Sequence, residues 1–285
     1  MDANKVKELK LTAAKMRKLI LEGVFNAKSG HPGGSLSATD IIANLYFNEM
    51  NVKVDEPKWA DRDRFVMSKG HGAPALYAAL ALKGFFPEED MKTLRKADSY
   101  LEGHPNMNCI PGVDMSTGSL GQGLSAALGM ELARKLDGKN YYVYSVLGDG
   151  EIQEGQIWEA AMAAAHYKAN HLIAFLDHNG LQIDGNITDV MSPEPVTDKF
   201  AAFGWFVQVV DGHDFAALEA ALAAAKAQSE GADAKPSMII CETVKGKGVS
   251  FMENKASWHG VAPKAEEKAQ ADAELDAVIK ELEGC

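Results

Sequence analysis

Cysteine is scarce in this chain, and long apolar runs are absent. Three cysteines, Cys109, Cys241 and Cys285, are spread over 285 residues. An odd, widely spaced set argues against a disulfide framework or a zinc site and fits a reducing compartment. No apolar run is long enough to span a membrane, and the lysine-rich residues 1–20 contain no apolar core of the signal-peptide type. We therefore expect a soluble, cytoplasmic protein that makes no contact with membranes.

An excess of positive charge is also missing. Lys and Arg number 29 against 40 for Asp and Glu, which gives a formal net charge of −11. This balance argues against a surface for nucleic acid or anionic lipid, so any affinity for phosphate must be local. Repeats and low-complexity linkers are absent too. The length and pattern predict a single domain, 1–285, with a charged tail from about 264 that forms a surface helix and ends at Gly284-Cys285.

Strand-like and helical patterns alternate along the chain. Strands are predicted at 64–68, 141–147, 172–177, 206–210 and 236–242, and helices at 6–27, 37–46, 73–82, 156–167 and 215–228. Glycine and proline at 30–33 predict a loop between the first two helices. Because the strand runs are continuously apolar, we expect a mainly parallel sheet that is covered by helices on both faces. The predicted fold class is therefore a doubly wound α/β layer.

A short acidic motif follows one of the predicted strands. Gly148-Asp149-Gly150 ends the run at 141–147, and Asn179 follows the next run. In a parallel unit both carboxyl-terminal strand ends open on the same edge of the sheet, so Asp149 and Asn179 are expected to meet there. Glycines let the backbone approach a phosphate, and oxygen donors suit Mg²⁺ shared with a diphosphate. The pattern predicts a metal-diphosphate site, although a GDG turn alone is also a common strand-to-helix corner.

Four further segments precede this motif in a fixed order. They are KSGHPGGS at 28–35, SKGHG at 68–72, EGHP at 102–105 and TGSLGQG at 117–123. Ahead of GDG…N, the ordered set resembles the amino-terminal, diphosphate-binding part of transketolase, over roughly residues 11–263. The resemblance implies the thiamine-diphosphate-binding fold. Single-chain members append a pyrimidine-binding and a carboxyl-terminal domain, for which we expect no room here, so the chain resembles the amino-terminal subunit of a two-subunit transketolase.

The cofactor implied by this resemblance is thiamine diphosphate, held with Mg²⁺, or with Ca²⁺ or Mn²⁺ as alternatives. Asp149, Asn179 and the backbone carbonyl of Leu181 would form the protein's share of the metal shell. His71 would lie near the diphosphate, and the loop with Ser119, where many members have proline, would touch the cofactor's rings. The residues that the resemblance assigns to the cofactor are His71, Gly118, Ser119, Leu120, Gly148, Asp149, Gly150 and Asn179.

The resemblance also implies a set of catalytic side chains. His31, His104 and His259 would surround the reacting carbons, where hydroxyls need hydrogen bonds and protons must move. Glu154 would touch a glutamate that activates the aminopyrimidine and that must come from another chain; an ordinary solvated carboxylate is the alternative for it. The other four histidines, His166, His171, His178 and His213, are expected to be structural.

The implied reaction is transfer of a two-carbon ketol unit from a ketose phosphate to an aldose phosphate, as in the pentose phosphate pathway, with the cofactor as covalent nucleophile. The implied partner is a carboxyl-terminal transketolase subunit with the pyrimidine-binding domain, in an α2β2 heterotetramer. A two-subunit relative that acts on a sulfonated or branched sugar would keep every motif, and so would a non-catalytic thiamine-diphosphate-binding module. A 1-deoxyxylulose-phosphate synthase or the α subunit of a 2-oxo acid dehydrogenase would keep GDG…N but fits the segments at 29–34 and 69–72 less well.

Overall fold

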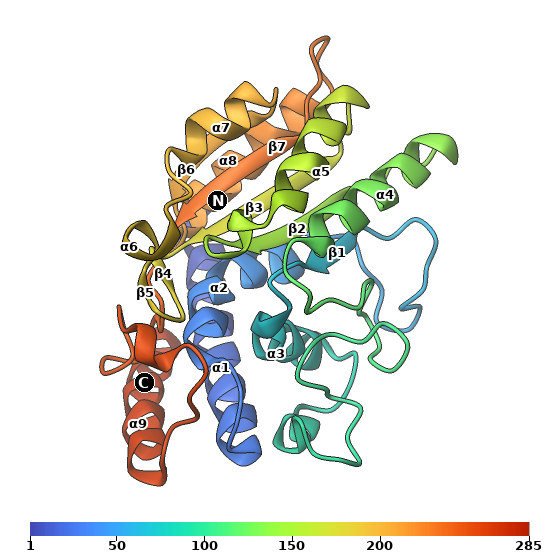
Figure 1. Ribbon diagram of the computed structural model, residues 1–285. Coiled ribbons are helices and arrows are strands. Elements are labelled where there is room, and N and C mark those ends of the chain that lie inside the picture. The colour runs from blue at the N-terminus through green and yellow to red at the C-terminus, as the bar shows by residue number, and fades with distance from the viewer. Residues whose placement is uncertain (285) are drawn as a thin grey trace.

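The computed structural model describes residues 1–284, and Cys285 lies outside them. A five-stranded sheet in the order β1-β2-β3-β7-β6 crosses the molecule, with every pair of neighbours parallel (Figure 1). Its strands are β1 (Arg64–Met67), β2 (Val143–Gly148), β3 (Leu172–His178), β6 (Phe206–Asp211) and β7 (Ser237–Glu242). The predicted strands are confirmed to within two residues at each end. Because all five run in the same direction, their carboxyl ends share one edge of the sheet.

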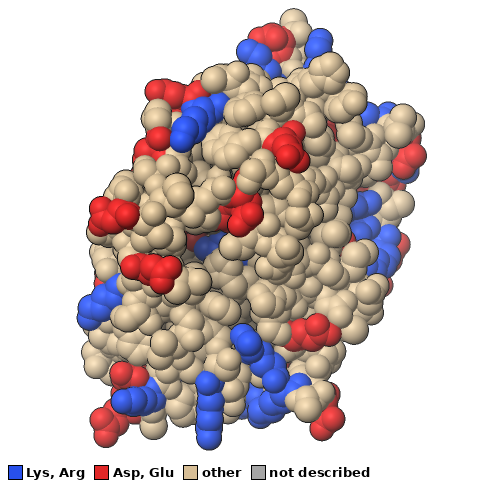
Figure 2. Space-filling model, viewed as in Figure 1, with Lys and Arg blue, Asp and Glu red and all other residues tan. Residues whose placement is uncertain are grey.

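Helices make up a large part of the remaining chain. They are α1 (Ala3–Ala27), α2 (Pro32–Asn44), α3 (Ala73–Lys83), α4 (Gln122–Leu136), α5 (Gly155–His166), α6 (Ile187–Met191), α7 (Val196–Ala202), α8 (Phe215–Ser229) and α9 (Ala265–Glu283). A small hairpin of β4 (Leu181–Gln182) and β5 (Gly185–Asn186) follows β3. None of the helices in residues 1–284 has the length and apolar character that crossing a bilayer demands. Figure 2 shows acidic and basic side chains interspersed over one face of the molecule.

Both faces of the sheet are covered, as the continuous apolar strands predict. Tyr144 and Val146 of β2 belong to an apolar cluster with residues of α1, α2, α3 and α8. Val143 and Leu147 point the other way and belong to a second cluster with residues of α4, α5 and α7. Successive strand residues alternate between the two faces, so a strand that is apolar throughout contributes to both cores. The doubly wound α/β architecture is therefore confirmed.

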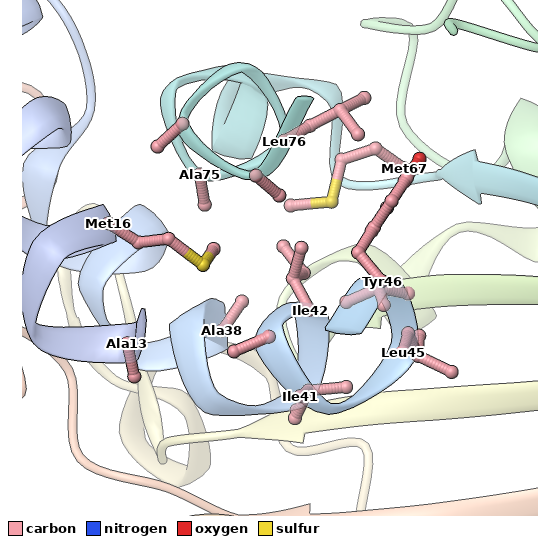
Figure 3. Packing of buried hydrophobic residues seen from close by; sticks show 14 of the residues in the cluster. Ala13, Met16, Ala38, Ile41, Ile42, Leu45, Tyr46, Met67, Ala75 and Leu76 are labelled. Atoms are coloured by element: carbon pink, nitrogen blue, oxygen red, sulfur yellow. The ribbon is translucent and has the colours of Figure 1, made fainter. Parts of the chain in front are cut away.

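Small side chains bring α1, α2 and α3 close together under the sheet. Figure 3 shows Met16 of α1 directed towards Ala38 of α2, with Ile42 of α2 beside them and Ala75 on the near side of α3. All four are buried, with at most 2% of their surface exposed. Dense packing of this kind restricts rigid-body movement of the helices. It therefore fixes α2, whose first turn lies at the functional site.

One predicted helix needs correction, and α4, α6 and α7 were missing from the prediction. The second helix begins at Pro32 rather than at residue 37, because proline is well tolerated in the first turn of a helix, where its missing N–H is not needed. Gly33 fits this turn since a side chain there would meet the Trp258 carbonyl oxygen at 2.8 Å. The helix α4 was not predicted at all. Its glycine-rich start conceals the apolar spacing of Leu124, Ala127 and Leu128, which bury against the sheet.

Candidate functional site

A cavity of about 320 Å³ opens at the carboxyl ends of β2 and β3. Figure 2 shows a recess near the middle of the visible face, with basic side-chain atoms inside it. Eleven of the predicted site residues line the cavity: His31, His71, Gly118, Leu120, Gly148, Asp149, Gly150, Glu154, Asn179, Leu181 and His259. Two others, Ser119 and His104, do not line it. The motifs are far apart in the sequence, and the parallel sheet brings them to one edge.

Asp149 is a buried carboxylate at the wall of this cavity. Only 3% of the residue is exposed. Its Oδ1 accepts a hydrogen bond from the Gly150 N–H at 2.9 Å, and its Oδ2 accepts one from the Gly180 N–H at 2.6 Å. Burial and the nearby carboxylate of Asp177 raise its pKa. No ion pair neutralises Asp149 among residues 1–284, so its charge faces the cavity without a direct counterion.

Two more oxygen atoms of the kind that bind metal ions lie beside Asp149, the Asn179 Oδ1 and the Leu181 carbonyl oxygen. The Asn179 Oδ1 accepts a hydrogen bond from the Leu181 N–H at 3.2 Å, and its amide nitrogen lies 3.3 Å from Asp177 Oδ2. Gly180 between them has a φ of +72°, a conformation that glycine adopts without strain. The Leu181 carbonyl accepts a hydrogen bond from Lys245 Nζ at 3.3 Å, so a cation already contacts this oxygen. A carboxylate, an amide oxygen and a carbonyl are the donor types of a hard divalent cation.

Sequence reasoning missed two buried lysines of the site. Lys69 is paired with Asp177, the last buried residue of β3, and donates to the Gly34 carbonyl at 2.9 Å. Burial alone would raise the pKa of Asp177, but Lys69 and the hydroxyls of Ser37 and Thr243 hold it below its ordinary range. Two features of the sequence could have revealed this ion pair: an aspartate inside an apolar strand and a lysine inside the SKGHG motif.

Lys245 is the second missed lysine and lies in the loop after β7. The residue is only 2% exposed and lines the cavity. Its Nζ lies 3.1 Å from Nδ1 of His259. Burial, with Lys69 close by, lowers the pKa of Lys245 to about 8. An anionic ligand at this place would compensate for the cost of burying the ammonium group.

Three histidines form a mutual cluster at the cavity. The ring centroids of His31 and His71 are 5.4 Å apart, those of His31 and His259 5.4 Å, and those of His71 and His259 5.1 Å. Burial and neighbouring cations lower the pKa of His31 to about 4, that of His259 to about 3, and that of His71 well below its ordinary value. His31 Nδ1 is buried and has no hydrogen-bond partner in the described part of the chain. His104 is exposed, and its ring centroid lies 6.4 Å from that of His31.

The loop 117–123 packs tightly against the SKGHG segment. A side chain on Gly70 would come within 2.5 Å of the Gly118 nitrogen. The two backbone segments therefore lie too close together for any residue other than glycine at position 70. Glu151, which the motif analysis also missed, ties this loop to the GDG turn. Its carboxylate accepts hydrogen bonds from the Gly121 N–H at 3.0 Å and the Gly148 N–H at 3.1 Å. Glu154 is exposed where it lines the cavity.

Comparison with known proteins identifies the family of this site. Residues 9–278 match the family model described as transketolase, thiamine diphosphate binding domain. The chain belongs to the transketolase family. Members of that family are transferases, and the transketolase family therefore accounts for the ordered motifs that line the cavity.

Relatives of two lengths match this transketolase-family chain. The 6-deoxy-6-sulfo-D-fructose transketolase subunit SqwG of Clostridium sp. (strain MSTE9) is 48% identical, with 94% of this chain and 96% of the relative covered. An apulose-4-phosphate transketolase subunit of Phocaeicola vulgatus is 44% identical, with 98% and 97% covered. Human transketolase is 42% identical over 91% of this chain but only 40% of its own length.

Solved transketolase structures share the fold. The Campylobacter jejuni transketolase has a TM-score of 0.85 at 31% identity, with 99% of this chain and 47% of that chain covered. The Pichia stipitis enzyme in complex with sedoheptulose-7-phosphate has a TM-score of 0.86 at 30% identity, with 98% and 45% covered. The chain thus spans less than half the length of these solved transketolases.

Proposed function

We propose that the chain is the diphosphate-binding subunit of a thiamine-diphosphate-dependent transketolase, which transfers a two-carbon ketol unit from a ketose phosphate to an aldose phosphate. The observation that carries the proposal is the convergence of the histidine cluster, Asp149 and Lys245 on one cavity at the carboxyl edge of the sheet. The family supports the cofactor. A cytoplasmic location is part of the proposal and is supported by the scarcity of cysteine.

The residues present fit a divalent cation and a diphosphate. Asp149 is a buried carboxylate without an ion-pair partner among the described residues, and the Leu181 carbonyl already accepts from a cationic side chain. Residues 1–284 contain no cluster of three or more His, Cys, Asp or Glu side chains suited to a metal. Asp149, Asn179 and Leu181 would therefore supply part of an oxygen shell that diphosphate and water complete, which favours Mg²⁺, with Ca²⁺ or Mn²⁺ as alternatives. His71 and Lys245 would face the diphosphate.

The histidine cluster suits the handling of hydroxyls and protons. Thiamine diphosphate, when bound, supplies the nucleophilic carbon. His31 lines the cavity and would contact a substrate hydroxyl there, while its Nδ1 is buried and has no partner among residues 1–284. The low pKa values of His31 and His259 keep both imidazoles neutral at pH 7, where one nitrogen can accept and the other donate. His104, at the rim, would contact the same substrate from outside the cluster, and Gly118, Ser119 and Leu120 would contact the cofactor rings.

A partner chain with the pyrimidine-binding domain would close the cavity. Two of the large apolar residues that line the cavity are exposed, Leu120 with 36% and Ile183 with 67% of their surface. Exposed apolar side chains at the mouth of a polar site favour an interface with another protein. The relatives named as subunits are matched over almost their whole length, which supports a two-subunit enzyme. An α2β2 composition is part of the proposal.

The donor sugar is the open part of the proposal. Relatives of this chain are named for 6-deoxy-6-sulfo-D-fructose and for apulose 4-phosphate, so a sulfonated or branched donor is the second candidate. A place in the pentose phosphate pathway would require xylulose 5-phosphate to be the better donor. A non-catalytic cofactor-binding module is the remaining alternative.

The test is a donor panel with ribose 5-phosphate as acceptor, thiamine diphosphate and Mg²⁺. The chain alone is compared with an equimolar mixture that contains the pyrimidine-binding chain. We expect turnover only in the mixture, and the donor with the highest turnover identifies the sugar substrate. An assembled mixture that turns over none of the donors would favour the non-catalytic module. Within the mixture, Glu154→Ala should weaken assembly or activity, and an unchanged complex would remove Glu154 from the interface.

A further inference from the structure

A buried network outside the cavity joins two helices to a neighbouring loop. Arg17 of α1 contacts Asp40 of α2 through two hydrogen bonds, Nη1 to Oδ1 at 3.1 Å and Nη2 to Oδ2 at 2.6 Å. His213, in the loop between β6 and α8, places its Nδ1 2.6 Å from Asp40 Oδ2. The side chains of Arg17 and Asp40 are 9% and 7% exposed, and that of His213 is 14% exposed. Water therefore competes little for these bonds.

The contact made by the other nitrogen of His213 shows which atoms donate and which accept in this network. His213 Nε2 lies 2.9 Å from the backbone N–H of Val244. A peptide N–H can only donate, so Nε2 is the unprotonated nitrogen, and Nδ1 carries the proton that it donates to Asp40. The neutral imidazole thus connects the buried carboxylate to the residue directly before Lys245.

Arg17 holds the same loop on the far side of Lys245. Its Nε donates to the Lys247 carbonyl at 3.0 Å. Gly248 packs so closely that a side chain there would meet Arg17 Cδ at 2.9 Å. The loop 243–249 is therefore held both before and after the one residue that points into the cavity.

We propose that His213 is a positioning residue of the cavity, which with Asp40 and Arg17 fixes the loop 243–249 so that the Lys245 ammonium reaches an anionic ligand. The identity of that ligand, thiamine diphosphate with Mg²⁺, rests on the proposed function. Gly33 leaves the space for the Lys245 side chain, whose Cγ would lie 3.2 Å from a side-chain carbon at position 33. A displacement of the loop by about 1 Å would take Nζ out of hydrogen-bonding distance of its partners.

Two conservative variants separate the two hydrogen bonds of the imidazole. His213→Gln keeps an acceptor near the position of Nε2, and His213→Asn keeps a donor near Nδ1 but loses the acceptor for Val244. Hydrogen exchange of the peptides that cover 243–249 is measured in the cofactor-free chain. We expect exchange there to rise about tenfold in His213→Asn, and by clearly less in His213→Gln, with the strands unchanged.

The dissociation constant for thiamine diphosphate with Mg²⁺ supplies the second readout, in the complex with the partner chain. We expect it to rise about tenfold in His213→Asn. In a Lys245→Met background the same substitution should change it no further, because His213 acts through Lys245. A merely structural role would give the same loss in both backgrounds.

The matched control is His171 at the amino end of β3, where Nδ1 lies 3.1 Å from the Tyr141 carbonyl oxygen. His171→Asn and His171→Gln should leave both the exchange of 243–249 and the dissociation constant at the parent values. Unchanged exchange in His213→Asn would overturn the proposal. So would unchanged affinity in a complex that binds the cofactor. A parent complex that binds no thiamine diphosphate would contradict the proposed function instead. The hydrogen-exchange comparison would then still test whether His213 holds the loop 243–249.

Discussion

Two buried lysines and two buried aspartates lie at the cavity wall or directly behind it: Lys69, Lys245 and Asp149 line the cavity, and Asp177 pairs with Lys69. Lys69 and Asp177 form a close ion pair, and each is at most 2% exposed. Lys245 and Asp149 are as deeply buried but form no ion pair with each other or with other residues of 1–284. A buried charge without a counterion is costly. The arrangement therefore favours a ligand that brings both signs of charge, as a diphosphate with a divalent cation does.

The neutral histidines make stability depend on pH. Burial with nearby cations lowers the pKa of His31 to about 4 and that of His259 to about 3. In the unfolded chain each would bind a proton near pH 6.5. As the pH falls from about 6.5 to 4, the unfolded state binds more protons than the folded state, so the free energy of unfolding falls.

Replacing both histidines should remove part of this dependence. In a His31→Gln, His259→Gln double variant, we expect the free energy of unfolding to fall less between about pH 7.5 and about pH 5 than in the parent chain. Urea unfolding without cofactor, repeated across this pH range, measures the slope of the free energy of unfolding against pH for the variant and for the parent chain. Equal slopes would show that the two imidazoles titrate in the folded protein as they do in the unfolded chain.

Single residues were predictable where a short motif surrounds them. The meeting of His31, His71, Asp149 and Asn179 at one cavity was predictable because their glycine-flanked segments are specific as an ordered set. Lys69 and Lys245 lie in or near recognised segments, but the local sequence does not distinguish a buried lysine from an exposed one. Their role depends on which distant residues the sheet places beside them.

At the scale of elements, two glycine contacts determine where α2 and α4 begin. Gly33 opens α2 beneath the Trp258 carbonyl, and Gly123 opens α4 directly against Ser68. The strands were predictable because continuous apolar runs persist whatever their neighbours are. The start of α2 and the whole of α4 were not, because glycine in a first turn weakens the helical pattern and its reason is a tertiary contact.

Gly123→Ala tests this account of α4. The added Cβ would lie 2.4 Å from Ser68 Oγ and 2.6 Å from Ser68 Cα, so the helix must move. We expect a loss of about 1–3 kcal/mol in the free energy of unfolding. Gly129→Ala, on the exposed face of the same helix with no atom within 4 Å, should gain about 0.5–1 kcal/mol. Urea unfolding compares the two, and effects of the same sign would contradict the packing argument.

At the scale of the whole molecule, the sheet presents one functional edge with an open cavity. The fold class and the edge were predictable from the alternation of strands and helices and from the positions of the motifs. The surface around the cavity was not, because Ile183 and Leu120 carry no sequence signal that separates an interface from an ordinary loop. Their exposure emerges only when the loops after β3 and before α4 are placed.

Ile183→Glu tests this surface as the docking site of the partner chain. A charge at a residue that is 67% exposed beside the cavity should cost the free chain little, but should weaken assembly about tenfold or more. Leu136→Glu, at the far end of α4 and 88% exposed, is the control and should leave assembly unchanged. Sedimentation of the mixed chains measures both dissociation constants. Equal affinity for the two variants would place the interface elsewhere.

The most direct test of the account is the rate of ketol transfer by the assembled complex carrying Asp149→Asn, with the best donor of the panel, thiamine diphosphate and Mg²⁺. The matched control is Asp63→Asn, a buried carboxylate that is 6% exposed and accepts from the Asn51 and Tyr142 N–H groups away from the cavity. We expect a loss of about a hundredfold or more for Asp149→Asn and a rate near the parent's per folded complex for Asp63→Asn. A complex that assembles and transfers the ketol unit equally well without the Asp149 carboxylate would contradict it.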